Sequence, residues 1–264
     1  MNQINDAMVE AAIAGSRIVL EVYRRGAESR EKADGSLVTE ADERAEAAIL
    51  EILNSRIPDI PVIAEESVAG GQVPKATERF LLVDPLDGTK DFVGGTDEFT
   101  VNIALIENGE PVAGVVTTPA RGQLFFGEVG QGASVRQYDF MSGEPHGDAQ
   151  AISARKRPES GAIAMTSRSH GSEETRKMLE RLGVTDVMPA GSSLKFCAIA
   201  EGRADLYPRL GRTMEWDTAA AHAVLRAAGG EVYVFDNQER GDPLRYGKEE
   251  RGFDNPHFLA VGKE

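Results

Sequence analysis

The chain has 264 residues, of which 41% are hydrophobic and 27% are charged, and this composition excludes a disordered, collagen-like or low-complexity protein. At this length we expect one large domain or two small ones. The 43 acidic residues outnumber the 29 basic ones, and the resulting net charge of −14 argues against a nucleic-acid polymer or an anionic membrane surface as partner. An anionic substrate therefore needs a bound cation or clustered basic side chains.

Cysteine, histidine and apolar patterning indicate the compartment and the kind of metal site. Cys197 has no second cysteine to pair with, and one cysteine with four histidines does not supply a Cys/His zinc cluster. The first ten residues lack the basic and apolar regions of a secretory signal, and no run of 18 apolar residues predicts a transmembrane segment. We expect a cytoplasmic protein, with peripheral docking to the inner membrane left open.

The first half of the chain reads as two helices followed by a run of strands. Apolar residues at helical spacing predict amphipathic helices over 5–25 and 39–56. After these helices the apolar residues alternate as in strands, and the pair Asn108 and Gly109 is a strong hairpin signal. Short turns between consecutive strands predict an antiparallel meander. Its strands are expected at 62–63, 80–83, 99–106, 112–118, 123–129 and 133–136.

The polar stretch 138–160 is interpreted as a connection between two lobes. Beyond it strands and helices alternate, which indicates an α/β (α+β) protein. We expect an N-terminal lobe over 1–150 with most of the metal ligands, and a C-terminal lobe over 151–264 with a phosphate pocket. The expected strands of the second lobe are 162–166, 184–188, 205–207, 231–235 and 258–261, and the expected helices are 172–182, 192–200 and 217–228.

The most informative segment is 84–89 (DPLDGT), which follows a predicted buried strand. A proline fixes the backbone after Asp84, and the Asp-Gly pair turns the chain, so that Asp84 and Asp87 converge beyond the strand end. The amides of Gly88 and Thr89 face the same point, which places donors for a phosphate oxygen beside acceptors for a hard cation. The alternative is a simple surface turn, which does not explain the acid at the strand end.

Three further acids are ambiguous when taken singly. Glu65 follows a predicted strand, where adjacent acids usually mark a solvated end. Asp217 begins an alanine-rich helix, where an N-cap is the ordinary role, and Asp42 has the spacing of a capping box. Two or three Mg²⁺ ions need about four carboxylates from different strand and helix ends. Glu65 and Asp217, added to Asp84 and Asp87, complete such a set.

The segments 84–89 (DPLDGT), 64–67 (AEES) and 216–217 (WD) resemble the metal-binding signatures of the lithium-sensitive, Mg²⁺-dependent phosphomonoesterase superfamily. This superfamily includes the inositol monophosphatases, the fructose-1,6-bisphosphatases and the 3′(2′),5′-bisphosphate nucleotidases. The resemblance runs from Lys32 to about Gly230 and implies a layered α/β/α/β/α sandwich. The Mg²⁺ ligands that it implies are the side chains of Glu65, Asp84, Asp87 and Asp217 and the main-chain carbonyl of Leu86.

The same resemblance implies catalytic roles for residues around these ligands. Thr89 would orient the attacking water and help to deprotonate it, with Asp42 as its partner base, and Glu65 is implied as a third catalytic residue. Lys32, in the segment 32–39 (KADGSLVT), lies on the N-terminal loop that approaches the metals in these enzymes. For Lys32 a solvated loop lysine is the alternative interpretation.

A second group of residues suits the binding of a phosphate. The segment 191–196 (GSSLKF) opens a predicted helix, where hydroxyls, free amides and Lys195 suit a phosphate, although serines there are also ordinary caps. Arg209, in the segment 206–209 (LYPR), adds another cation, with a salt-bridged or solvated arginine as the alternative.

These segments, together with a TSRSH sequence, resemble the bacterial CysQ type of bisphosphate nucleotidase more closely than the inositol phosphatases. The resemblance implies that Ser192, Lys195 and Arg209 hold the phosphate that is not cleaved. It also implies that His170, with Arg168 nearby, flanks the nucleoside, whereas an isolated histidine is more often a surface residue.

The expected activity is hydrolysis of the 3′-phosphate of adenosine 3′,5′-bisphosphate to AMP and phosphate. The sulfated analogue is a further expected substrate, which would link the protein to sulfur metabolism. One Mg²⁺ would activate the water and another would stabilise the leaving oxygen. The alternatives are an inositol monophosphatase or sugar bisphosphatase on the same metal site, and a non-hydrolytic nucleotide-sensing module. Monomer and homodimer are both left open.

Overall fold

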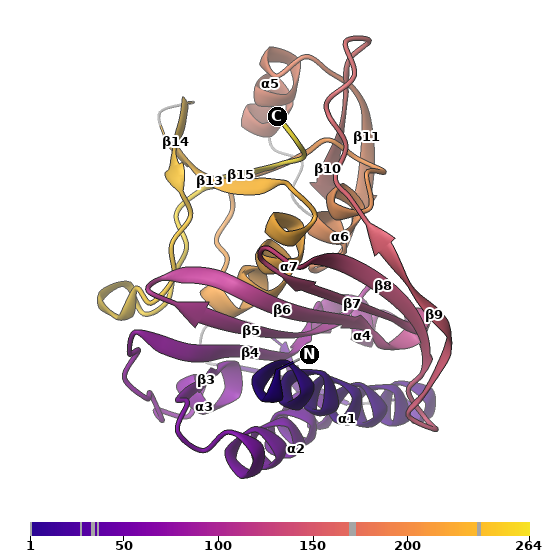
Figure 1. Ribbon diagram of the computed structural model, residues 1–264, viewed down its shortest axis with the longest axis vertical. Coiled ribbons are helices and arrows are strands. Elements are labelled where there is room, and N and C mark those ends of the chain that lie inside the picture. The colour runs from indigo at the N-terminus through magenta and orange to yellow at the C-terminus, as the bar shows by residue number, and fades with distance from the viewer. Residues whose placement is uncertain (1, 27, 33–34, 36, 169–172, 237–238) are drawn as a thin grey trace.

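The computed structural model describes residues 2–264 except 27, 33–34, 36, 169–172 and 237–238 (Figure 1). Helices and sheets alternate in five layers, as the α/β/α/β/α expectation requires. Two helices form the first layer, a seven-stranded sheet the second, two helices the third, a six-stranded sheet the fourth and one helix the fifth.

The first layer consists of α1 (Gln3–Arg25) and α2 (Glu40–Arg56), close to the predicted bounds. Both helices bury one apolar face, largely of alanine, valine and isoleucine, against each other and the first sheet. They approach so closely that a side chain at Gly15 would place its Cβ 2.7 Å from Ile49 Cδ1. Among the described residues, no helix is both long and apolar enough to cross a membrane.

The second layer is a sheet in the order β3-β4-β5-β6-β7-β8-β9, in which β3 pairs parallel to β4 and the later strands form an antiparallel meander. The meander is therefore confirmed. Asn108 and Gly109 both have positive φ, at 52° and 77°, as the predicted tight hairpin requires. The strands are β3 (Val62–Ala64), β4 (Arg79–Asp87), β5 (Thr100–Glu107), β6 (Glu110–Thr118), β7 (Gln123–Glu128), β8 (Gly132–Asp139) and β9 (Glu144–Ile152).

The interpretation of 138–160 as a connection is wrong for much of its length, because it contains the end of β8 and all of β9. β9 is an edge strand, and most of its residues are exposed on both faces. Such a strand needs no apolar alternation, so the sequence pattern did not reveal it. The edge strand β14 (Glu239–Pro243) was missed for the same reason, since all its residues are exposed.

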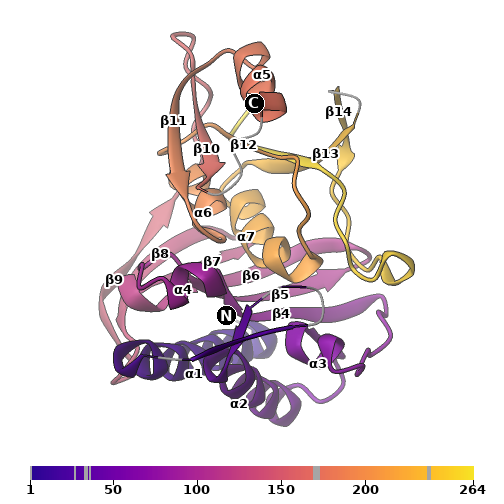
Figure 2. The same ribbon diagram turned by 180° about the vertical axis from the view of Figure 1, so that it is seen from behind.

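The fourth layer is a mixed sheet in the order β11-β10-β12-β15-β13-β14. Helix α5 (Glu173–Arg181) lies on its outer face (Figure 2). There Met178 belongs to one buried cluster with strand residues such as Leu206 and Leu259. These elements match the predicted alternation of strands and helices. The remaining strands are β10 (Ala162–Ser167), β11 (Val184–Ala190), β12 (Leu206–Arg209), β13 (Glu231–Asp236) and β15 (Phe258–Val261).

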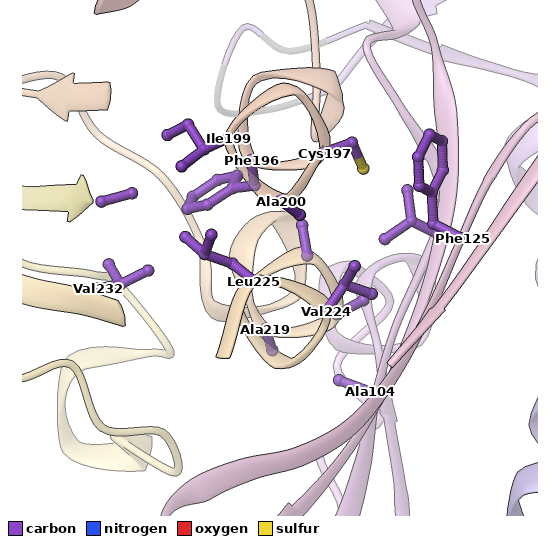
Figure 3. Packing of buried hydrophobic residues seen from close by; sticks show 14 of the residues in the cluster. Ala104, Phe125, Phe196, Cys197, Ile199, Ala200, Ala219, Val224, Leu225 and Val232 are labelled. Carbon is purple, nitrogen blue, oxygen red and sulfur yellow. The ribbon is translucent and has the colours of Figure 1, made fainter. Parts of the chain in front are cut away.

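The central layer consists of α6 (Leu194–Ala200) and α7 (Glu215–Ala227), whose apolar side chains fill the space between the sheets (Figure 3). Helix α7 lies directly on β6 and β7, because a Cβ at Gly114 would lie 2.2 Å from the Ala220 carbonyl oxygen, and one at Gly127 would lie 2.7 Å from Val224 Cα. The division into lobes at residue 150 stays a prediction, since this buried cluster contains side chains from both halves.

An ion pair between half-buried Arg155 and buried Asp205 joins the start of the second half to the residue before β12. The Asp205 carboxylate accepts two hydrogen bonds from the Arg155 guanidinium, at 2.8 and 2.9 Å, and one from the Ile163 amide at 2.7 Å. Burial raises the pKa of Asp205, but these hydrogen bonds and the Arg155 charge outweigh burial and leave the pKa below its ordinary value. The folded state therefore gains stability from this carboxylate above about pH 4 and loses it as the pH falls through the lower folded pKa.

We expect Asp205→Asn to lower the free energy of unfolding by about 1–3 kcal/mol at pH 7, because the Arg155 charge loses its partner. Urea unfolding at pH 7 and at about pH 3.5 measures this loss, which should shrink at the lower pH. Asp148→Asn, on the exposed β9, is the matched control and should stay within about 0.5 kcal/mol of wild type. A deficit that is the same at both pH values would contradict the assignment.

Candidate active site

Three carboxylates from distant parts of the chain meet at one edge of the first sheet. Glu65 is the first residue of α3 (Glu65–Ala69), directly after β3, and Asp84 lies near the end of the neighbouring parallel strand β4. Asp217 lies in the first turn of α7, which packs over this sheet. One ligand oxygen of each of these residues lies within 4.8 Å of the others.

The electrostatics of this group indicate a site for a cation. Burial, with the charges of neighbouring acids, raises the pKa of Asp84 and of Asp217 well above the ordinary range. Burial also raises the pKa of Asp87 to about 6, although the Lys195 charge lowers it. Clustered carboxylates with raised pKa values are stabilised in the ionised form by a bound cation, and oxygen ligands suit Mg²⁺.

Two further observations show that the surroundings fit an ion. Asn102 lies opposite Asp84 in the β4–β5 ladder and is 1% exposed, yet neither polar atom of its side chain finds a hydrogen-bond partner among the described residues. Buried amides are normally hydrogen-bonded, so this one marks a polar site prepared for a ligand. A positive charge already neighbours one of the three carboxylates, because the Lys32 ammonium lies 2.8 Å from Glu65 and 2.6 Å from Glu66. Lys32 is therefore ion-paired rather than solvated.

The side chains of Thr89 and Asp42 contact each other. One Asp42 oxygen accepts hydrogen bonds from the Thr39 amide and hydroxyl and so closes the capping box of α2. The other Asp42 oxygen accepts from the Thr89 hydroxyl at 3.2 Å. The capping interpretation of Asp42 is therefore confirmed, and its role as partner base stays a prediction. The Thr89 hydroxyl also lies 3.2 Å from the Leu86 carbonyl. Burial raises the pKa of Asp42 and makes it a better proton acceptor.

Thr89 begins the short helix α4 (Thr89–Val93), and Gly88 before it has a φ of 93°. This left-handed conformation, together with a neighbour 3.1 Å from the position of a Cβ, explains why glycine stands there. The DPLDGT segment therefore runs from a buried strand through a glycine turn into a helix.

Cationic side chains also line this cavity, which has a volume of about 310 Å³. The Lys195 ammonium donates to the Ser192 and Ala190 carbonyls, and burial lowers its pKa to about 8 in spite of the Asp87 charge. The Arg209 guanidinium donates to the Ser167 hydroxyl at 2.7 Å. Arg209 Nε and Ser192 Oγ are buried and have no hydrogen-bond partner in the part of the chain that the structure describes.

Most of the residues predicted for the site therefore lie together. The cavity is lined by Glu65, Asp84, Leu86, Asp87, Gly88, Thr89, Arg168, Ser192, Lys195, Arg209 and Asp217. Lys32 lines a neighbouring cavity, which also has Glu65 and Asp217 in its wall. His170 lies outside the described residues.

Sequence reasoning missed Asn102 and Glu98. The apolar residues of the strand 99–106 alternate, and this pattern assigns Asn102 to the opposite face, so a polar residue on that face was a usable signal. Glu98 offered no local signal, because its partners lie at positions 121, 168 and 191.

The C-terminal segment holds the helix turn that carries Asp217. Asn255 donates to the Met214 carbonyl at 2.8 Å, just before α7, and the Glu215 carboxylate accepts from the amides of Gly247 and Lys248. The Asp217 carboxylate itself accepts from the Met214 amide at 2.9 Å. Asp217 is thus the third residue of α7. One of its carboxylate oxygens accepts the capping bond, and the other takes no part in that bond.

Comparison with known proteins finds a matching family model and similar proteins. A sequence model of the inositol monophosphatase family matches residues 1–257. The 3′(2′),5′-bisphosphate nucleotidase CysQ of Escherichia coli O157:H7 is 41% identical over 257 residues, which cover 96% of this chain and 97% of that protein. The CysQ of Salmonella typhimurium LT2 is 42% identical over 246 residues, or 92% of this chain and 93% of that protein.

Solved structures give the same picture. The chain superposes on CysQ from Bacteroides thetaiotaomicron, a bacterial member of the inositol monophosphatase family, with a TM-score of 0.79 and 37% identity, covering 98% of this chain and 97% of the other. The extragenic suppressor protein SuhB from Bartonella henselae superposes with a TM-score of 0.76 at 26% identity, covering 100% of this chain and 94% of that chain.

We expect Asp84→Asn to separate stability from Mg²⁺ binding. Without divalent ions the variant should be at least as stable as wild type, because it removes one charge from a buried group of like charges. Mg²⁺ at about a hundred times its Kd should stabilise the wild type by about 2.7 kcal/mol, and the variant by clearly less.

Urea unfolding with and without Mg²⁺ measures both effects. Asp59→Asn, at an exposed position, is the matched control and should gain as much stability from Mg²⁺ as the wild type. Equal stabilisation of wild type and Asp84→Asn would show that the ion binds elsewhere.

Proposed function

The chain belongs to the inositol monophosphatase family, and from this premise we propose that it is a bisphosphate nucleotidase that cleaves the 3′-phosphate of adenosine 3′,5′-bisphosphate to give AMP and phosphate. The observation that carries this proposal is that one cavity is lined both by the carboxylates of Glu65, Asp84, Asp87 and Asp217, here called the acidic wall, and by the cations Lys195 and Arg209, here called the cationic wall. The acidic wall suits a phosphate bound through Mg²⁺, and the cationic wall suits a second phosphate bound directly. Use of the sulfated analogue and a link to sulfur metabolism stay predictions.

In this proposal Mg²⁺ is held by the side chains of Glu65, Asp84, Asp87 and Asp217 and by the Leu86 carbonyl. When bound, Mg²⁺ supplies positive charge that stabilises a transferring phosphoryl group and favours the ionisation of water. The protein supplies this site from rigid strand and helix ends, so its oxygens are positioned before a substrate arrives. Two or three ions stay the expected number.

Proton handling falls to Thr89 and Asp42. The Thr89 hydroxyl donates a hydrogen bond to Asp42 and can accept one from the attacking water. As the water gives its proton to Thr89, Thr89 passes its own proton to Asp42, and the raised pKa of Asp42 favours this acceptor role. Glu65, which belongs to the acidic wall, would orient the same water.

The remaining cavity residues bind the nucleotide. The amides of Gly88 and Thr89 bind the phosphate that is cleaved. Ser192, Lys195 and Arg209 bind the second phosphate, and this assignment is supported by the buried Ser192 Oγ and Arg209 Nε, which lack a partner among the described residues. A buried donor without a partner costs stability unless a ligand satisfies it.

The proposal also covers residues at the edge of the cavity. Arg168 lines the cavity and its side chain is 48% exposed, which suits a contact with the nucleoside, and the role of His170 stays a prediction. Lys32 balances the charge of Glu65 and Glu66 next to the bound phosphate. The cytoplasmic location and the choice between monomer and homodimer stay predictions.

Phosphate release with Mg²⁺ tests the proposal when adenosine 3′,5′-bisphosphate, inositol 1-phosphate and fructose 1,6-bisphosphate are compared side by side. We expect the highest kcat/KM for the nucleotide, because the cationic wall matches its second phosphate. A clear preference for inositol 1-phosphate would refute the substrate assignment. Nucleotide binding without phosphate release would point to a sensing module instead.

Arg209→Ala sharpens this test by removing one cation of the second-phosphate wall. The kcat/KM for adenosine 3′,5′-bisphosphate should fall about 10- to 100-fold, the value of a hydrogen bond to a charged group. Inositol 1-phosphate, which lacks the second phosphate, should lose less. Arg203→Ala, an exposed arginine paired with Glu201, is the control and should behave as wild type.

A further inference from the structure

Glu98 is a buried carboxylate that belongs neither to the acidic wall nor to the protein surface. Its side chain is 7% exposed and lies just before β5. One oxygen accepts hydrogen bonds from Arg121 at 3.0 Å and from Arg168 at 2.8 Å, and the other accepts from the Gly191 amide at 2.8 Å. This single side chain therefore contacts two elements that line the cavity.

The first of these elements is the loop that precedes α6. Ser192, directly after Gly191, has a φ of 43°, which is uncommon for a residue with a side chain. Such a conformation persists when its neighbours are held firmly, and the Glu98 carboxylate holds the adjacent amide. The Ser193 amide in the same loop donates to Asp87, so a shift of this loop would also reach the acidic wall.

The main chain of Glu98 packs against the same loop. A Cβ at Gly191 would lie 2.8 Å from the Glu98 carbonyl oxygen, and a Cβ at Gly88 would lie 3.1 Å from it. Glu98 thus lies between the DPLDGT turn and the loop of Ser192. Its carboxylate and its carbonyl together set the separation of these two segments.

The second element is Arg168, whose side chain is 48% exposed on the cavity wall. A long, half-exposed arginine has many accessible rotamers, and ordering it costs conformational entropy. The hydrogen bond to Glu98 restricts these rotamers before a ligand arrives. The guanidinium keeps further N–H groups that can donate to a ligand.

We propose that Glu98 is a positioning residue for the part of the substrate that is not cleaved. Through one oxygen it orients Arg168, and through the other it fixes the loop of Ser192, so that both meet the ligand in one arrangement. This inference rests on the proposed nucleotidase function. Charge repulsion alone predicts the opposite effect. A carboxylate repels a nearby anionic ligand, so neutralising that carboxylate should tighten binding.

Positioning and electrostatic repulsion predict opposite changes in KM when Glu98 is replaced by glutamine. Glu98→Gln therefore gives a direct test with two substrates, adenosine 3′,5′-bisphosphate and adenosine 3′-monophosphate. For the bisphosphate we expect KM to rise about 10-fold or more, with a smaller fall in kcat, because the loop that Glu98 fixes binds the second phosphate and reaches the acidic wall only through the Ser193 amide. The monophosphate, which lacks the second phosphate, should show a smaller rise in KM. An unchanged or lowered KM, or an equal rise for both substrates, would overturn the inference.

Asp97→Asn is the matched control. Asp97 pairs with the same Arg121, at 2.9 Å, but is largely exposed, and among the described residues it has no hydrogen bond to Arg168 or Gly191. We expect its KM and kcat to stay within about 2-fold of wild type for both substrates. A rise in KM equal to that of Glu98→Gln would assign the effect to Arg121 and overturn the inference.

Arg168→Ala keeps the inference testable if Glu98→Gln does not fold. This variant should raise KM for the bisphosphate with little change in kcat, and combining it with Glu98→Gln should cost less than the sum of the two single effects. A KM within about 2-fold of wild type, or full additivity, would contradict a role through Arg168. A wild-type enzyme that does not cleave the bisphosphate refutes the proposed function itself, whatever the variants do.

Discussion

Mutual repulsion among clustered carboxylates is the constraint on which this site depends. Glu65, Asp84 and Asp217 bring ligand oxygens within 4.8 Å of one another, and burial with the neighbouring negative charges raises the pKa of Asp84 and of Asp217. Such a group is stable in its ionised form when a cation is present, and Lys32 already supplies part of that charge to Glu65. A bound cation would therefore offset the remaining negative charge of the acidic wall.

The scaffold must hold these acids together against their repulsion, and it does so with close packing. Glycines at 114 and 127 let α7 lie directly on the sheet, and the C-terminal segment fixes the first turn of α7 through Asn255 and Glu215. Asp217 cannot move away without breaking these contacts. The parallel pair β3 and β4 fixes Glu65 and Asp84 at one edge in the same way.

Local signals account for what the sequence predicted well. Helical periodicity found α1 and α2, and the acids of the DPLDGT segment stood out because a strand end, a proline and a glycine turn occur together. Exposed edge strands such as β9 bury neither face, so no pattern marked them. Glu98 and the pairing of Lys32 with Glu65 depend on partners far away in sequence, and only the fold brings these partners together.

The central claim is that the acidic wall binds divalent cations, and anomalous scattering from crystals grown in Mn²⁺ tests it most directly. Mn²⁺ prefers the same oxygen ligands as Mg²⁺ and gives a signal that identifies its position. The account predicts anomalous peaks between the carboxylates of Glu65, Asp84, Asp87 and Asp217. Side chains turned away from one another, without a peak between them in excess Mn²⁺, would contradict it.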